Sequence, residues 1–327
     1  MFLEFYGLAE QPFGVTPNPR FLYFSPTHRE ALASLFCGLE TERGFLSLVA
    51  QPGAGKTTLL FQLLARLRGT ARTAFIFQTQ CDARQLLRYL ATDLGLDPGE
   101  TDPVTLHTRL SLFLLAEARA GRKVVVVIDE AQNLDDDVLE AVRLLSDFET
   151  PARKLLQVVL AGQPDLARKL ERPALRQLRQ RLAVMSWLDP LPRDHIGQYI
   201  DHRLRVAGCV GSSPFSASAL NVIVERSEGI PRQINHLCFQ ALCLGCAIGR
   251  RRIDGDIMRE VIRDPTWTPP RSEAKPLDIA SPVDVVRLRV ARLVASAMAA
   301  AGPPSEADLD TALDRYVSET RFSRASG

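Results

Sequence analysis

The segment at residues 50–57 constrains the fold of this chain more than any other feature, because its glycine-rich pattern belongs between a strand and a helix. It reads Ala-Gln-Pro-Gly-Ala-Gly-Lys-Thr and fits the relaxed phosphate-loop pattern, with Ala50 in place of the first glycine. An apolar run precedes it and an amphipathic stretch follows it. Gly53 and Gly55 permit the tight turn and the close approach of phosphate that a Cβ would block. The segment therefore predicts a loop that cradles an anion at a helix N-terminus.

Short apolar runs alternate with amphipathic stretches around this loop. The runs predict strands at residues 45–50, 73–78, 124–128 and 155–160, and the stretches predict helices that begin near residues 57, 82, 104 and 136. A further helix opens at Ser25, with Thr27 and Glu30 spaced as a capping box, and ends near Gly44. Because parallel strands need crossover helices, this α/β alternation predicts a parallel sheet with helices on both faces and a central strand at 124–128.

The rest of the chain divides into three further parts. Helices predicted at 193–207, 216–227, 231–248 and 254–263 follow one another without strands and form a helical lid. A linker rich in proline and charge follows, with two helices near 283–300 and 305–320 as a small tail. The first 24 residues hold aromatic side chains among three prolines and predict an extended, docked segment. The predicted domains are 1–190, including that segment, 191–264 for the lid, and 265–327 for linker and tail.

Composition limits the class of protein and its location. The chain has 327 residues, of which 46% are hydrophobic and 24% charged, as in an ordinary globular protein. Its net charge of +2 creates no global field that would draw it to nucleic acid or acidic lipid. Six cysteines are too few for a disulfide scaffold, the first residues do not form a signal peptide, and no apolar run approaches the ~20 residues of a membrane span. These features predict a cytoplasmic protein without a transmembrane segment.

Two acidic residues follow the apolar run at 124–128. A carboxylate at a strand tip beside a nucleotide can hold Mg²⁺, which assigns Asp129, and Glu130 can orient and deprotonate an attacking water. In the loop, Lys56 supplies a charge to the β- and γ-phosphates and Thr57 a hydroxyl to Mg²⁺. Together these residues predict ATP and Mg²⁺ as cofactors. Taken alone, each motif also fits a plain glycine-rich turn or an acidic strand end.

Three single residues are further candidates. Gln163 follows the strand predicted at 155–160 and either senses the γ-phosphate or attacking water, or is a turn residue. Arg232 begins the third lid helix and either points back to the phosphates or is solvated at the helix start. His28 either edges an adenine pocket or is a capping or surface histidine.

An arginine-rich helix follows the fourth predicted strand. Arg176, Arg179 and Arg181 lie on its outer face, while Leu175, Leu178 and Leu182 point inward. An ATPase that needs a cation from a neighbouring subunit would use one of these arginines as a finger. The alternative is a solvated helix face.

Several motifs in order resemble those of the AAA+ ATPases of the ExeA/GspA general-secretion type, over about residues 1–263. The resemblance is carried by the aromatic and proline-rich opening, the phosphate loop, Asp-Glu-Ala-Gln-Asn-Leu at 129–134, Gly-Gln-Pro at 162–164, the block at 175–181, and Gly-Ile-Pro-Arg-Gln-Ile-Asn at 229–235.

The resemblance implies a P-loop NTPase of the AAA+ type, with a five-stranded parallel sheet of order 5-1-4-3-2 in an αβα sandwich, a C-terminal helical lid, and nucleotide held between subunits of a ring. It implies Gln163 as the first sensor, Arg232 as the second, and Arg181 as the trans finger, with Arg179 and Arg176 as substitutes. The residues implied to contact the nucleotide are Gln51, Pro52, Gly53, Ala54, Gly55, Lys56, Thr57, Thr58, Arg232 and His28.

Two functions follow from this resemblance. The first is an oligomeric ATP hydrolase that remodels or assembles a protein complex, in the cytoplasm or attached to the inner membrane through a partner. Proteins of the ExeA type usually continue into a transmembrane helix and a peptidoglycan-binding domain, neither of which is expected in these residues. The second is an ATP-gated DNA-binding regulator similar to the transposition ATPases TnsC and TniB, for which the three arginines at 250–252 are the best support. An adaptor that binds ATP without hydrolysing it is a third interpretation.

Overall fold

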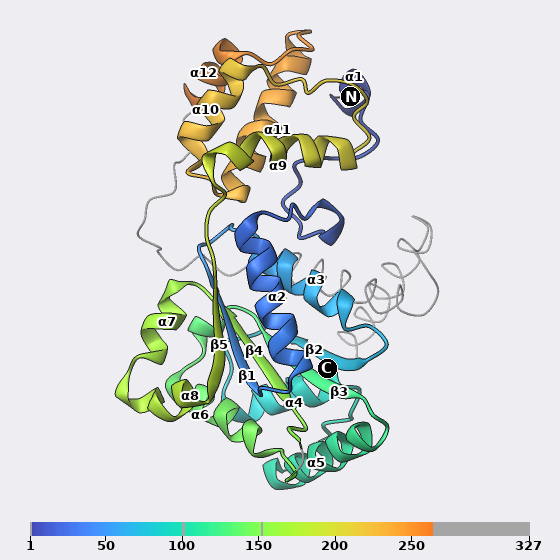
Figure 1. Cartoon of the computed structure of the whole chain (residues 1–327), viewed down its shortest axis with the longest axis vertical. Coiled ribbons are helices and arrows are strands. Elements are labelled where there is room, and N and C mark those ends of the chain that lie inside the picture. The colour runs from blue at the N-terminus through green and yellow to red at the C-terminus, as the bar shows by residue number, and fades with distance from the viewer. Residues whose placement is uncertain (1, 100–101, 152, 264–327) are drawn as a thin grey trace, which may run out of the picture. The chain divides into compact units, whose positions relative to one another are not determined.

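A five-stranded parallel sheet lies among helices α2 to α8 in the computed structural model, which describes residues 2–99, 102–151 and 153–263 (Figure 1). The strand order is β2-β3-β4-β1-β5, and every pairing is parallel. Read from the other edge this is 5-1-4-3-2, so the predicted order is confirmed. The strands are β1 (Phe45–Ala50), β2 (Ala71–Ile76), β3 (Lys123–Ile128), β4 (Gln157–Gly162) and β5 (Leu182–Leu188).

Helices cover both faces of the sheet, and the central strand shows why its sequence is continuously apolar. Val125 and Val127 of β3 pack into the core under α2 (Pro26–Glu40) and α3 (Lys56–Arg66). Val124, Val126 and Ile128 point the other way, into a second core. Because successive side chains of a strand point to opposite faces, only burial on both faces makes every position apolar. The helices of that second core are α4 (Ala83–Asp93), α5 (Pro103–Arg119), α6 (Asp136–Leu144), α7 (Pro164–Leu170) and α8 (Arg176–Arg181).

The N-terminus of α2 differs from the predicted capping box. Ser25 is the N-cap, its side chain accepts a hydrogen bond from the His28 backbone N–H, and Pro26 takes the first helical position. This is the arrangement that favours proline at the start of a helix, where no N–H is needed. The helix ends at Glu40, before Gly44.

Four helices follow β5 and correspond to the helices predicted for the lid: α9 (Arg193–Val206), α10 (Ala217–Ser227), α11 (Pro231–Ala247) and α12 (Gly255–Arg263). They pack around a hydrophobic core separate from the two cores of the sheet. All described residues fall within one compact unit, Met1–Thr268. The division at residues 190 and 264 stays a prediction, and the predicted tail helices lie outside the described residues.

The N-terminal segment packs against these helices through its aromatic side chains, as expected. It is not wholly extended, because α1 (Phe2–Tyr6) is a helix and Pro19–Phe21 forms a 3₁₀ turn. The rings of Phe2 and Phe239 meet edge to face at 5.8 Å. Arg203 of α9 lies over the Phe21 ring and donates to the Pro12 carbonyl at 2.5 Å. Within the described part of the chain, no helix has both the length and the apolar character needed to cross a membrane.

Candidate functional site

The phosphate loop connects the carboxyl end of β1 to α3. Gly53 has φ +82° and Gly55 φ +100°, a left-handed backbone that favours glycine. Gly55 is the N-cap of α3, and as a glycine it makes no side-chain capping hydrogen bond. The first-turn N–H groups of a helix have no acceptor within the helix. The loop therefore aims uncapped amide donors and the positive end of a helix dipole at one place, where an anion would be stabilised.

The side chains of Lys56 and Thr57 meet those of Asp129 and Glu130. Lys56 Nζ donates to Asp129 Oδ1, and to Glu130 Oε1 at 2.8 Å. Thr57 Oγ1 donates to Asp129 Oδ2 at 2.8 Å. Lys56 and Asp129 are buried, whereas the Glu130 side chain is 40% exposed. The structure thus joins residues 73 positions apart in sequence.

Sheet topology brings these four residues together. Strands β1 and β3 both pair with β4, so their carboxyl ends lie at the same edge of the sheet. Asp129 directly follows β3, and its backbone N–H donates to the Ile76 carbonyl of β2, which extends the sheet by one bond. Glu130 then adopts a left-handed backbone, with φ +54°. Such a conformation is costly for a residue with a side chain, and it turns this carboxylate toward Lys56.

Opposite charges control protonation at this site. Burial alone would lower the pKa of Lys56, but the Asp129 and Glu130 carboxylates outweigh it and raise that pKa. Burial alone would raise the pKa of Glu130, but the Lys56 ammonium and the hydrogen bonds from Lys56, Gln132 and Gln163 together outweigh it, and the pKa of Glu130 is lowered. An ammonium and an ionised glutamate therefore face each other near neutral pH.

Gln163, at the end of β4, also reaches Glu130. Its Nε2 donates to Glu130 Oε2 at 3.1 Å. The sequence alone did not single out Gln132, which donates to the same oxygen at 2.7 Å. No local signal could have identified it, because its second partner, the backbone N–H of Gln163, lies 31 positions away.

The start of α11 rests on the phosphate loop. The backbone N–H of Arg232 donates to the Gly53 carbonyl at 3.1 Å. A Cβ on Gly53 would lie 2.6 Å from the Arg232 Cβ, so glycine is required here by contact as well as by φ. The structure therefore brings the predicted second sensor to the loop through its backbone, and its contact with phosphate stays a prediction.

His28 is buried beneath the loop. One ring nitrogen, Nδ1, lies 2.7 Å from Ser25 Oγ, and the ring also forms a hydrogen bond with the Ala54 backbone. Burial lowers its pKa to about 4, with the Ala54 bond acting in the opposite direction. His28 is therefore neutral near pH 7 and supports the phosphate loop through its hydrogen bond with the Ala54 backbone. It is not a surface histidine, and its contact with adenine stays a prediction.

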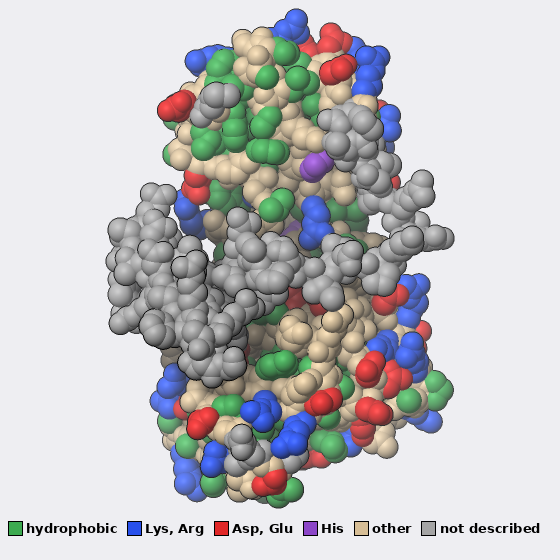
Figure 2. Space-filling model, turned by 180° about the vertical axis from the view of Figure 1, so that it is seen from behind, with side chains coloured by type: hydrophobic (Ala, Val, Ile, Leu, Met, Phe, Trp, Pro, Cys, Tyr) green, Lys and Arg blue, Asp and Glu red, His purple; other side chains and the backbone are tan. Residues whose placement is uncertain are grey.

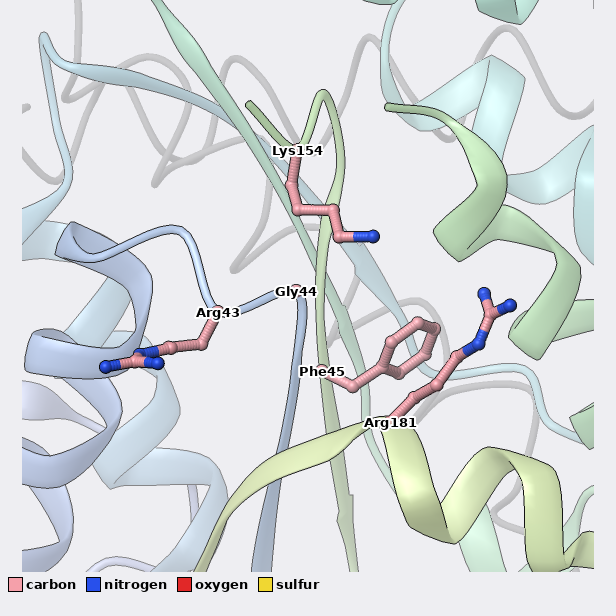
Figure 3. Close-up of a pocket in the computed structure, with 5 residues that line it drawn as sticks. All are labelled: Arg43, Gly44, Phe45, Lys154 and Arg181. Carbon is pink, nitrogen blue, oxygen red and sulfur yellow. The ribbon is translucent and has the colours of Figure 1, made fainter. Parts of the chain in front are cut away.

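The three candidate finger residues do not lie at this site. Arg176 and Arg179 are exposed on α8. Arg181 pairs with Asp147 at 2.8 Å and lines a cavity of 340 Å³ with Lys154 and Phe45 (Figure 3). Phe45 is the first residue of β1, so this cavity lies at the opposite end of that strand from the phosphate loop. Any of these arginines would have to act on a second copy of the chain, as a trans finger does, and that role stays a prediction.

The residues present fit ATP and Mg²⁺. Mg²⁺ prefers oxygen ligands and is commonly held by one or two carboxylates or hydroxyls together with substrate phosphates. Thr57 and Asp129 place two such oxygens 2.8 Å apart beside the loop. Around them, Gln51 and Pro52 are exposed, Ala54 is buried, and Thr58 is half-buried in the first turn of α3.

Comparison with known proteins agrees with this architecture. A family model described as "AAA domain" matches residues 39–170. The chain is 42% identical over 260 residues to General secretion pathway protein A of Aeromonas hydrophila. That match covers 79% of this chain but only 47% of the relative, so the chain spans about half of that protein's length.

Solved structures with low sequence identity share the fold. A crystal structure of Cdc6p from Pyrobaculum aerophilum aligns with a TM-score of 0.61 at 18% identity, over 94% of this chain and 83% of that one. The ORC2 protein of Aeropyrum pernix, solved as ADPNP–ADP complexes, aligns with a TM-score of 0.61 at 15% identity, over 93% and 82%. With the family match, the relative and the sheet order in agreement, residues 39–170 of the chain carry an AAA domain, and 79% of the chain is similar to General secretion pathway protein A.

Proposed function

We propose that this protein binds ATP with Mg²⁺ and hydrolyses it. The observation that carries the proposal is the meeting of Lys56 and Thr57 with Asp129 and Glu130 at the carboxyl edge of the sheet. A helix N-terminus, a lysine, a hydroxyl and two carboxylates are the groups that nucleotide hydrolysis requires in one place. The structure of ORC2 in complexes with ADPNP and ADP supports nucleotide binding by this fold.

Each side chain takes the role that its position allows. Lys56 and the loop N–H groups bind the β- and γ-phosphates, and Thr57 and Asp129 hold Mg²⁺, which neutralises charge on the phosphates when bound. Glu130 orients a water and accepts its proton. Gln163 and Arg232 act as the two sensors. Lys56 exchanges its bonds to the carboxylates for bonds to phosphate, which frees Glu130 Oε1 for the water.

We further propose that the chain works as a ring-shaped oligomer that remodels or assembles a protein complex in the cytoplasm, with attachment to the inner membrane through a partner. The likeness to General secretion pathway protein A supports this role. The position of Arg176, Arg179 and Arg181 away from their own chain's loop supports a site completed by a neighbouring subunit.

Steady-state turnover and ATP binding test the enzymatic proposal. The wild-type chain hydrolyses ATP with Mg²⁺ at concentrations that permit assembly. Glu130→Gln binds ATP but loses turnover by about 10²–10⁴-fold, because the general base is gone. Lys56→Ala weakens binding itself. A wild-type chain that binds ATP but shows no turnover at any concentration would contradict the proposed hydrolysis and favour the adaptor that binds ATP without hydrolysing it.

The DNA-binding alternative receives no specific support from the arginines at 250–252. Arg250 pairs with Asp254 at 3.6 Å, and Arg251 lies over the Phe5 ring at 5.3 Å. On the described part of the face in Figure 2, Lys and Arg side chains are interspersed with Asp and Glu. Titration with duplex DNA at ~50 mM and higher salt separates the two functions, because phosphate contacts give a steep salt dependence.

A further inference from the structure

Gln132 joins the ends of two strands at the site. It lies in a 3₁₀ turn, Ala131–Asn133, directly after Glu130. Its Nε2 donates to Glu130 Oε2 at 2.7 Å, and its Oε1 accepts from the Gln163 backbone N–H at 3.1 Å. One side-chain amide therefore connects the acid that follows β3 to the residue that follows β4.

The chemistry of the two partners fixes the orientation of this amide. A backbone N–H can only donate, so the Gln132 atom that faces Gln163 must be the oxygen. The NH₂ group then faces Glu130 and requires an acceptor there, which an ionised carboxylate provides. Turning the amide over would put two donors together on one side and two acceptors on the other.

The surrounding fold is shaped to hold the bridge. A Cβ on Gly162 would lie 2.6 Å from Gln132 Oε1 and 2.9 Å from Leu166 Cβ, so a side chain at this position would displace the amide. Lys169 of α7 donates to the Gln132 carbonyl at 3.1 Å and to the Leu134 carbonyl. The turn that carries Gln132 is thus tied to β4 on one side and to α7 on the other.

Glu130 has its two oxygens assigned to different parts of the site. Oε1 bonds to Lys56, and Oε2 accepts from the amides of Gln132 and Gln163. If Lys56 turns to phosphate, the two amides are the partners that keep the carboxylate in place. Both amides depend on the end of β4. Gln132 is held there by the Gln163 backbone N–H, and Gln163 itself directly follows the strand.

We propose that Gln132 is a positioning residue for ATP hydrolysis, which holds the Glu130 carboxylate and couples its direction to Gln163 at the end of β4. This inference rests on the proposed ATPase function. Gln132 touches no part of the phosphate loop in the contacts described, so its loss lowers the rate of hydrolysis and leaves ATP affinity unchanged.

Two substitutions at Gln132 and one control test the proposal. Gln132→Ala removes both bonds, whereas Gln132→Glu keeps an oxygen toward Gln163 but replaces the donor toward Glu130 by a second carboxylate. Asn133→Ala changes a side chain of the same turn that bonds to Thr79, and it leaves the backbone bond from the Asn133 N–H to the Glu130 carbonyl in place. Both Gln132 variants lose kcat by about tenfold to a hundredfold, the effect of a misplaced catalytic group. Their KM, their dissociation constant for ATP and their melting temperature equal those of the control variant Asn133→Ala.

Three results would overturn the inference. Gln132→Ala with wild-type kcat removes the positioning role. If Gln132→Glu has wild-type kcat while Gln132→Ala does not, the bond to the Gln163 backbone is the one that matters, and the donor toward Glu130 has no role. A loss of ATP binding or of melting temperature in proportion to kcat makes its role structural. Lack of turnover in the wild-type chain is a separate result, seen without any variant, and it contradicts the proposed function on which the inference rests.

Discussion

At the scale of single residues, the site depends on groups whose ordinary chemistry is changed by burial or by backbone. Gly53 combines a left-handed φ with a contact to α11, Glu130 adopts a left-handed backbone despite its side chain, and His28 is buried in its neutral form. The features at Gly53 and at His28 each give a prediction.

Gly53→Ala should weaken ATP binding more than its backbone strain explains. A left-handed alanine costs about 1–2 kcal/mol. At Gly53 its Cβ would also meet the Arg232 Cβ, 2.6 Å away, and force α11 off the loop. Gly69→Ala is the matched control, because Gly69 has φ +83° and nothing within 4 Å of the added Cβ. Chemical unfolding and ATP titration of both variants measure the difference, and equal behaviour would show that the contact with α11 has no effect.

His28 should make the folded state less stable in acid. Its pKa is about 4 when folded, below the ordinary value near 6.5, so the unfolded chain binds more protons between these values. Its contribution is therefore complete above pH 6.5 and decreases as the pH falls toward 4, by about 2 kcal/mol between pH 7 and pH 5. His28→Gln removes this part of the pH dependence. Urea unfolding of both chains at the two pH values measures it, and an identical loss in both would contradict the assignment.

At the scale of elements, much of the fold could be predicted from the sequence. Strand β1 is found at the predicted residues, and β2 and β4 lie within two residues of their predicted positions. Strand β5 was expected only from the resemblance, because its exposed face carries Met185 and Trp187 and shows no polar alternation. Helix α1 was missed because the prediction of an extended segment rested on prolines. These begin only at residue 12 and give no information about residues 2–6.

The site was predictable only in its local motifs. The phosphate loop and the acids after β3 could be predicted because each motif is a run of consecutive residues. Gln132 and the Arg232 backbone could not, because each acts on a segment that folding brings near from elsewhere in the chain. Ser25 contacts its near neighbour His28, but the bond from His28 to the Ala54 backbone of the loop forms only on folding.

Ser25→Ala should affect the loop as well as helix α2. Loss of an N-cap costs about 1 kcal/mol, and here it also removes the partner of His28 Nδ1. Ser216→Ala removes the N-cap of α10, where Ser216 accepts from the Ala219 N–H. Both variants should lose similar stability, but only Ser25→Ala should bind ATP more weakly. Equal ATP affinity in the two would show that the Ser25–His28 contact does not support the loop.

At the scale of the whole molecule, one nucleotide site would link parts of the chain that are separate in sequence. The N-terminal segment packs on α9 and α11 and leads into α2, whose N-cap contacts the histidine under the loop. The start of α11 bonds to the loop from the other side. A ligand that moves the loop therefore acts on the lid helices and the N-terminal segment together.

Assembly should depend on ATP in this arrangement. The Glu130→Gln chain, which retains ATP, should have a larger mass in solution with ATP and Mg²⁺ than without them. Light scattering of the same sample in both conditions measures the change. A mass that is independent of ATP would contradict a ring with the nucleotide between subunits.

The most direct test of the central claim is an experimental structure of the Glu130→Gln chain with ATP and Mg²⁺. We predict the triphosphate against the N–H groups of residues 53–57, with Lys56 Nζ on phosphate and the metal beside Thr57 and Asp129. ATP bound elsewhere on the chain, with Lys56 still paired to Asp129, would contradict it.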